Sequence, residues 1–255
     1  MGAANTPLVA RNLKKSFGML EVVSGFDHEL APGIVTGLVG PNGAGKTTIF
    51  NMLSGVLAPD SGEVLLEGKV ITGKPLFVAS RLGLGRSFQE IRLFPSLSCL
   101  DNCILYAQSV SSSSLLHTVF LPRSTRRQLA SARQRSREAL AFVGLESQAH
   151  VLAGSLSYAE QKLLAIARLM SLGARTLLLD EPASGLDRRG VETLLEVVHR
   201  LVGGGRTVLL IEHNLDVVRD SCQVVLFLDR GTILAAGPPD EVFARPELAE
   251  VYFSA

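Results

Sequence analysis

The 255-residue sequence contains no tryptophan, only three cysteines, and few aromatic residues, which make up 5% of the chain. It also lacks a strong excess of charge, because 25 basic and 24 acidic side chains leave a formal net charge of +1. The net charge therefore creates no electrostatic field that would attract the chain to nucleic acid or to an acidic bilayer. We expect no nucleic-acid partner. No apolar run reaches the roughly 18 residues of a membrane-spanning helix, so the sequence predicts no span.

The three cysteines, Cys99, Cys103 and Cys222, form no paired framework. Cys99 and Cys103 lie four residues apart on an expected helix, a spacing that would let both side chains bind the same metal ion. No further cysteine or histidine lies close in sequence, so we favour small apolar core residues. The opening residues show no basic start followed by an apolar core, and we therefore expect no secretory signal. Together these features predict a reducing compartment, the cytoplasm.

The stretch GPNGAGKTT, from Gly40 to Thr48, matches the pattern G-x-x-x-x-G-K-[ST] between an apolar run and a helical pattern. Glycines let the loop point successive N–H groups at an anion, and the helix N-terminus adds a partial positive charge. Lys46 would reach the β- and γ-phosphates, and the Thr47 hydroxyl would ligate Mg²⁺. The sequence therefore predicts a site for a nucleoside triphosphate.

Two apolar runs that read as buried strands each end in a pair of polar residues. Asp180 and Glu181 follow the first run, and Glu212 and His213 follow the second. Two carboxylates at the end of a buried strand are costly unless a cationic group is near. In an open α/β sheet this edge is where ligands bind, so we expect both pairs to face one site.

The remaining pattern predicts an antiparallel start followed by parallel strands that alternate with helices. Residues 8–39 read as short β segments, and EVLLEGKVI reads as a hairpin that turns at Glu67 and Gly68. A second hairpin turns at Arg230 and Gly231 before a terminal helical piece. A helical insertion runs from about residue 89 to residue 170.

Two helices of this insertion begin with a capping signal. Ser98 with Asp101 resembles a capping box, and Ser157 with Glu160 matches S-x-x-E before an apolar helix. A helix N-terminus that begins with serine is also a good anion receptor.

The stretch between the two signals changes character along its length. The Ser-rich run from residue 109 indicates a loop. The helix that follows it carries Arg126, Arg133 and Arg137 along one face. RNA or acidic lipid headgroups are alternatives for this face, but a solvated surface is favoured because no aromatic residues interleave.

Taken together, these motifs resemble the ATP-binding cassette (ABC) family over nearly the whole chain. The Walker A motif matches at Gly40, Pro41, Asn42, Gly43, Ala44, Gly45, Lys46, Thr47 and Thr48, and the Q-loop matches at Gln89. The signature motif matches at Leu156, Ser157, Tyr158, Ala159 and Glu160. Walker B matches at Asp180 with Glu181, the D-loop at Ser184, Gly185, Leu186 and Asp187, and the switch histidine at His213. Phe17 matches the aromatic that stacks on adenine, although core packing would be favoured for it without the resemblance.

The resemblance implies an α/β fold. It consists of a RecA-like P-loop core with a mostly parallel sheet, an N-terminal antiparallel β subdomain, and an inserted α-helical subdomain. Residues 1–255 would form a single ABC ATPase domain. Within it, 7–88 and 171–255 would build the core and the β subdomain, and 89–170 would build the helical subdomain with the signature.

The resemblance also implies ATP and Mg²⁺ as cofactors and assigns roles to the matched residues. Glu181 would be the general base for the attacking water, and His213 would hold the γ-phosphate and orient that water. Asp187 would help communication between two copies. The catalytic group would comprise Lys46, Gln89, Glu181 and His213. The metal would be organised by Thr47, Gln89 and Asp180.

The implied partners are a second ABC ATPase subunit, identical or different, and transmembrane permease subunits. Ser157 and its helix would complete the partner's ATP site in trans, so two ATP molecules would join two subunits. Movement would pass to the permease near Gln89, and the permease would receive solute from a binding protein. The chain would therefore lie at the cytoplasmic face of the inner or plasma membrane.

Three softer features resemble the ATPase subunits of branched-chain amino acid importers, a subfamily that includes relatives serving urea and small amides. They are the long insertion after IRLFPSLSCLDN, the tyrosine in LSYAEQ and the tail PPDEVFARPELAEVY. The signature departs from the family's LSGGQ at Ala159, where a glycine would allow close backbone approach to the γ-phosphate.

Two other functions stay open. One is a weakly hydrolysing nucleotide-binding switch, against which the intact Glu181 and His213 argue. The other is a soluble, non-transport ABC protein. Repair proteins of that kind need a long coiled-coil insertion and ribosome-associated ones usually carry two cassettes, and this sequence has neither.

Overall fold

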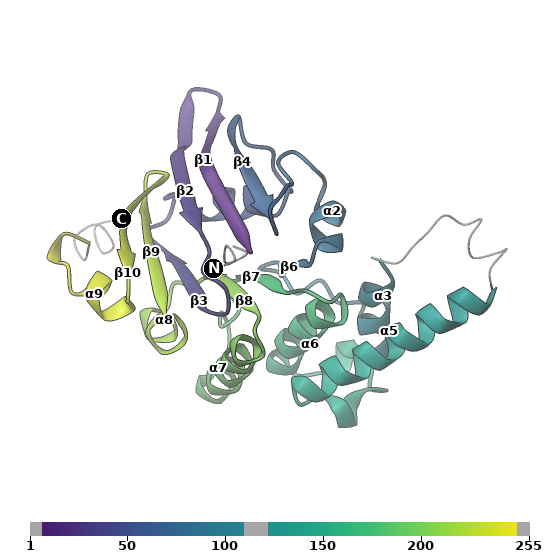
Figure 1. The fold of residues 1–255 in the computed structure, drawn as a ribbon. Coiled ribbons are helices and arrows are strands. Elements are labelled where there is room, and N and C mark those ends of the chain that lie inside the picture. Colours follow the sequence, from purple (N-terminus) through teal and green to yellow (C-terminus); the bar gives the residue numbers. More distant parts are fainter. Residues whose placement is uncertain (1–6, 110–121, 249–255) are drawn as a thin grey trace, which may run out of the picture. The chain divides into compact units, whose positions relative to one another are not determined.

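The structure, a computed structural model, describes the backbone of residues 7–109 and 122–248 (Figure 1). The chain divides into two compact units, residues 1–86 with 175–255, and residues 87–174. The lobes expected from the sequence have their boundaries at 88/89 and 170/171, close to this division. Residues 110–121 of the Ser-rich run expected to form a loop lie outside the described residues, as does the side chain of Arg126, whereas both ends of that run belong to the helices Cys99–Ser109 and Pro122–Phe142.

The first unit contains a four-stranded antiparallel sheet in the order β2-β1-β4-β5. Its strands are β1 (Leu8–Phe17), β2 (Leu20–Glu29), β4 (Ser61–Leu66) and β5 (Lys69–Val70). The β4–β5 hairpin turns at Glu67 and Gly68, which have φ angles of 50° and 73°. These left-handed values suit the tight turn of a two-residue hairpin, and the expected hairpin is confirmed.

A six-stranded sheet in the order β10-β9-β3-β8-β7-β6 forms the rest of the first unit's β structure. Its strands are β3 (Val35–Val39), β6 (Leu84–Arg86), β7 (Thr176–Asp180), β8 (Thr207–Ile211), β9 (Val224–Asp229) and β10 (Thr232–Gly237). The pairs are parallel except β9 with β10, whose hairpin turns at Arg230 and Gly231 as expected. Every residue of β3, β7 and β8 is buried, which is why these strands read as unbroken apolar runs.

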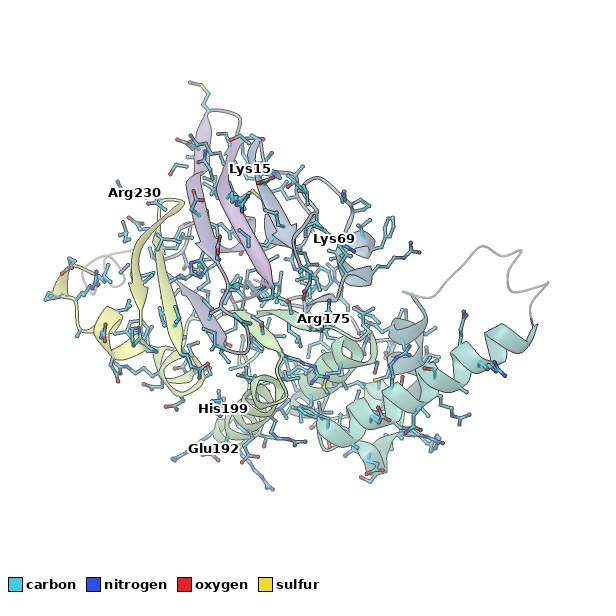
Figure 2. The ribbon with its side chains drawn as sticks, in the orientation of Figure 1. Lys15, Lys69, Arg175, Glu192, His199 and Arg230 are labelled. Atoms are coloured by element: carbon cyan, nitrogen blue, oxygen red, sulfur yellow. The ribbon has the colours of Figure 1, made fainter. Side chains whose placement is uncertain are left out.

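The helices of the first unit are α1 (Lys46–Leu53), α2 (Leu76–Arg81), α7 (Arg188–Gly203), α8 (Leu215–Ser221) and α9 (Pro239–Phe243). On α7, Leu194, Val197 and Leu201 are buried, and Figure 2 shows Glu192 and His199 directed outward. This is the amphipathic pattern of a helix that covers a sheet. Helix α2 and strand β6 were not predicted from the sequence. β6 has only three residues, and its pairing with β7 makes it a strand.

The second unit is helical and consists of α3 (Cys99–Ser109), α5 (Pro122–Phe142) and α6 (Tyr158–Ser171), with single turns at Glu146–Gln148 and Ala153–Ser155. Cys103, Leu140 and Leu164 are fully buried in this unit. Burial raises the pKa of the Cys103 thiol to about 12, so this cysteine packs as a small apolar residue. Among the residues described, no helix combines the length and apolarity that crossing a bilayer would need.

Candidate functional site

The glycine-rich loop connects the buried strand β3 to the first turn of α1. Gly45 caps α1 with a φ of 97°, a conformation that L side chains rarely adopt. At Gly40 the φ is 150°, and a Cβ there would collide with the carbonyl oxygen of Leu228 on β9. The backbone of Gly231 donates a hydrogen bond of 2.9 Å to the Ala44 carbonyl and so supports the loop. The loop is therefore held by the sheet before any ligand arrives.

Lys46 lies inside this loop with only 6% of its surface exposed. Its ammonium donates to the carbonyl oxygens of Gly40 at 2.7 Å and Pro41 at 2.8 Å. Burial lowers the pKa of Lys46 and the nearby Glu181 carboxylate opposes that shift. A cation held in a ring of backbone groups is well placed to bind phosphate oxygens.

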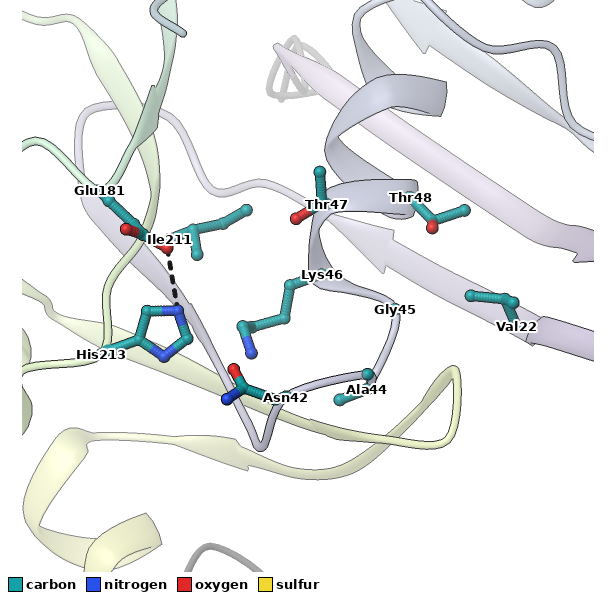
Figure 3. Close-up of a pocket in the computed structure, with 11 residues that line it drawn as sticks. Val22, Asn42, Ala44, Gly45, Lys46, Thr47, Thr48, Glu181, Ile211 and His213 are labelled. Atoms are coloured by element: carbon teal, nitrogen blue, oxygen red, sulfur yellow. Dashed lines mark ion pairs between the residues drawn. The ribbon is translucent and has the colours of Figure 1, made fainter. Parts of the chain in front are cut away.

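A pocket of about 240 Å³ opens above the loop (Figure 3). Two of its lining residues, Val22 and Ile211, are apolar, and the others are loop or polar residues. The lining residues are Val22, Asn42, Gly43, Ala44, Gly45, Lys46, Thr47, Thr48, Glu181, Ile211 and His213. The structure thus brings together the loop and the polar ends of two strands, as expected from the sequence.

Glu181 and His213 meet on one side of this pocket (Figure 3). His213 Nε2 lies 3.0 Å from Glu181 Oε1. The Glu181 side chain is 19% exposed and that of His213 is 42% exposed, so both reach solvent that enters the pocket. A carboxylate beside an imidazole, facing a buried ammonium, can accept a proton from water near a bound phosphate.

Asp180, the last residue of β7, is buried and lies beside Arg86 of β6. The guanidinium Nη2 is 3.9 Å from Asp180 Oδ2. Arg86 also donates to Ser54 Oγ at 2.6 Å and to Asn51 Oδ1 at 2.7 Å, which fixes it against α1. Arg86 was not predicted from the sequence, because a single arginine in an unrecognised short strand carries no spacing signal. The structure places its guanidinium beside the Asp180 carboxylate.

The other matched residues of the first unit do not line the pocket. Phe17 ends β1 with 51% of its surface exposed, and the Lys15 ammonium lies 5.7 Å from its ring. The D-loop forms a tight turn in which Leu186 donates to the Ala183 carbonyl at 3.2 Å. Asp187 then caps α7 by accepting from the Gly190 amide at 2.9 Å. Adenine stacking by Phe17 and communication by Asp187 stay predictions.

The signature segment belongs to the second unit, where Ser157 caps α6. Ser157 Oγ accepts from the Glu160 amide at 3.3 Å, and Glu160 Oε2 accepts from the Ser157 amide at 2.8 Å. The expected capping box is confirmed. Hydrogen bonds from Gln148 and Ser157 lower the pKa of Glu160. Tyr158 is 48% exposed, so the start of this helix presents a polar, solvent-facing end.

The second unit also contains Gln89 and the other capping signal. Gln89 lies in the irregular stretch before α3 and is exposed. Ser98 Oγ accepts from the Asp101 amide at 3.0 Å and lies 2.6 Å from Asp101 Oδ2, so the second expected capping interaction is present as well.

Comparison with known proteins matches the family of ABC transporters to residues 23–184. The chain belongs to the ABC transporter family. It is 34% identical to the high-affinity branched-chain amino acid transport ATP-binding protein LivG of Escherichia coli (strain K12), over 96% of this chain and 97% of LivG. It is 33% identical to BraF of Pseudomonas aeruginosa, a protein of the same description, over 96% of each chain.

Solved structures of ABC cassettes agree with this assignment. The ADP conformation of an ATP-binding cassette from an ABC transporter superposes with a TM-score of 0.83 at 28% identity, covering 97% of this chain and 98% of that one. A nucleotide-free ABC cassette gives the same TM-score at 27% identity, covering 96% and 97%. The expected RecA-like core with its antiparallel and helical subdomains is confirmed. So are the expected ATP binding and ATPase activity, at the level of the ABC family.

Proposed function

We propose that this chain is the ATP-hydrolysing subunit of an ABC importer for branched-chain amino acids or related small solutes. It works at the cytoplasmic face of the membrane, bound to permease subunits. The similarity to LivG and BraF along nearly the full length of all three chains supports the solute class. The permease and a solute-binding protein select the solute, and this chain supplies the energy.

The observation that carries the hydrolytic role is the 3.0 Å contact of Glu181 with His213 across the pocket from Lys46. Lys46 and the loop amides hold the β- and γ-phosphates and neutralise their charge. His213 contacts the γ-phosphate and orients the attacking water, and Glu181 accepts that water's proton. Positioning and charge neutralisation of this kind account for most of the catalysis of phosphoryl transfer.

The oxygen donors around the pocket suit Mg²⁺. Thr47 lines the pocket beside Glu181, and Asp180 directly precedes Glu181 at the end of β7. Hydroxyl and carboxylate oxygens are ligands that Mg²⁺ prefers. Thr47 and Asp180 would hold the ion, directly or through water, and the metal role expected for Gln89 stays a prediction. Bound there, Mg²⁺ would supply the positive charge that neutralises the negative charge developing on the transferred phosphate.

The proposal includes a dimer that encloses two ATP molecules. The pocket supplies Lys46 and His213 from one chain, and a second anion-receiving helix would come from the signature of the other chain. The exposed, serine-capped start of α6 has the chemistry for that contact. Loss of the γ-phosphate then removes the contacts that join the two chains, and the interface opens.

Purification of the native complex through a tag on this chain tests the function. The complex is reconstituted into proteoliposomes with its co-purified solute-binding protein. We expect ATP hydrolysis to rise when that protein is loaded with leucine, isoleucine or valine, and labelled amino acid to enter the vesicles. Ribose serves as the control solute. A complex without a permease, or one stimulated by ribose alone, would contradict the proposal.

A further inference from the structure

A buried carboxylate lies at the end of β8, between the pocket residues Ile211 and His213. Glu212 is only 3% exposed. Its Oε1 accepts the backbone N–H of Ala183 at 2.7 Å, and its Oε2 accepts the N–H of His213 at 3.3 Å. Burial of a charged group is costly unless hydrogen bonds compensate it. One side chain therefore ties the loop after β7 to the loop after β8.

The loop that Glu212 holds contains a strained residue. Glu181 has a φ of 46°, in the left-handed region that a residue with a Cβ adopts at an energetic cost. Such a conformation persists when its surroundings hold it. Glu181 donates to the Ile211 carbonyl at 3.0 Å, and Ser184 donates to the Glu181 carbonyl at 3.2 Å. The bond from Ala183 to Glu212 completes this set of contacts.

We propose that Glu212 is a positioning residue for ATP hydrolysis. Its carboxylate holds the strained turn after Glu181 and the backbone of His213 together, and so keeps those two side chains in contact over the pocket. The inference rests on the proposed roles of Glu181 and His213. Since Glu212 does not line the pocket, it acts through its neighbours and not on the nucleotide.

Glu212→Gln is the decisive variant because it keeps the shape of the side chain and leaves one acceptor oxygen for two N–H donors. Phosphate release is measured on the complete complex with its permease. A displacement of about 1 Å at a reacting group can lower a rate about 100-fold. We expect kcat to fall roughly 10- to 100-fold and KM for ATP to change by less than about twofold, because the Lys46 loop is untouched.

Thr207→Val is the matched control on the same strand. Thr207 begins β8, is buried, and its Oγ1 accepts the Gly33 amide at 3.0 Å. Valine removes this bond with little change of volume, far along the strand from Glu212. The melting temperature of Thr207→Val is expected to fall, whereas the kcat of this variant is expected to stay within about twofold of wild type.

Amide hydrogen exchange of the full chain supplies a second readout. Exchange of the peptide 181–187 is expected to accelerate in Glu212→Gln and to stay unchanged in Thr207→Val. Three results would each overturn the inference. They are a wild-type kcat in Glu212→Gln, a loss of kcat in Thr207→Val equal to that in Glu212→Gln, and unchanged hydrogen exchange of the peptide 181–187 in Glu212→Gln.

If Glu212→Gln does not fold, Glu212→Asp is measured in its place, and failure of both to fold would assign Glu212 to stability alone. A wild-type complex without ATPase activity would instead contradict the proposed function, and the exchange comparison would still show whether Glu212 holds the turn.

Discussion

The pocket at the glycine-rich loop and the signature segment, both of which we propose to contact the phosphates of ATP, are built in opposite ways. The nucleotide pocket is organised by the sheet, with a buried lysine, a glycine that has no room for a Cβ, and a strained glutamate. The signature segment is a helix start at which Ser157 and Glu160 hydrogen-bond to each other, with the serine exposed and the glutamate half-buried. Its capping hydrogen bonds lie within one short stretch, and Gln148 donates one further bond to Glu160 at 2.6 Å. The pocket is therefore preorganised by tertiary contacts, and the signature mainly by local ones.

The largest expected effect tests the chemistry of the pocket. In Glu181→Gln we expect ATP binding to survive and hydrolysis to fall by orders of magnitude, because an amide cannot accept the proton from the attacking water. An ATP-held dimer should accumulate, visible by size-exclusion chromatography with light scattering. Turnover near wild type would show that Glu181 is not the base, and a lone protomer with ATP present would contradict the dimer.

Next in size is a test of the preorganised loop, with a matched pair of glycines. Gly43 has a φ of 80° and open space around it, so Gly43→Ala should cost only the backbone strain of about 1–2 kcal/mol. Gly40→Ala adds a collision with the Leu228 carbonyl and should destabilise the chain by more. Thermal unfolding of the two variants measures the difference. If both variants lost the same amount of stability, the close approach of Gly40 to β9 would not be what holds the loop.

A smaller effect separates the helix cap that Ser157 forms in its own chain from the contact that we propose it makes with ATP bound to the partner chain. Ser157→Ala and Ser98→Ala each remove a helix-capping oxygen, and each should lower the free energy of unfolding by about 1 kcal/mol. Turnover should fall only in Ser157→Ala, because only that serine belongs to the signature. Chemical denaturation and phosphate release measure the two quantities. A similar loss of turnover in Ser98→Ala would remove the evidence for a nucleotide contact at Ser157.

The smallest expected effect concerns the departure at Ala159. Ala159→Gly removes one methyl group, which we expect to crowd the γ-phosphate at a cost on the order of 1 kcal/mol, so turnover should rise about fivefold. In a heterodimer we expect the gain at the ATP site of the partner's Walker A loop, which this signature is proposed to complete. The measurement is steady-state phosphate release by the complex. Unchanged or lower turnover would show that the alanine does not slow the reaction.

Much of the fold followed from local pattern. The turn at Glu67 and Gly68, the glycine loop before Lys46 and the box of Ser157 with Glu160 each have a short-range signal, and the structure contains all three. The strand β6 and helix α2 were missed because each is six residues or shorter. Both depend on neighbours that are distant in sequence, such as the pairing of β6 with β7.

The amino-acid sequence by itself determined the phosphate loop, the polar strand ends and the helix cap, because their chemistry depends on residues adjacent along the chain. Only the tertiary structure decided that Glu181 meets His213, that Arg86 lies against Asp180, and that Glu212 bridges two loops. Each of these contacts joins neighbouring strands of one sheet or the loops that directly follow them. The order and register of those strands are set by packing of the whole core, which no local pattern encodes.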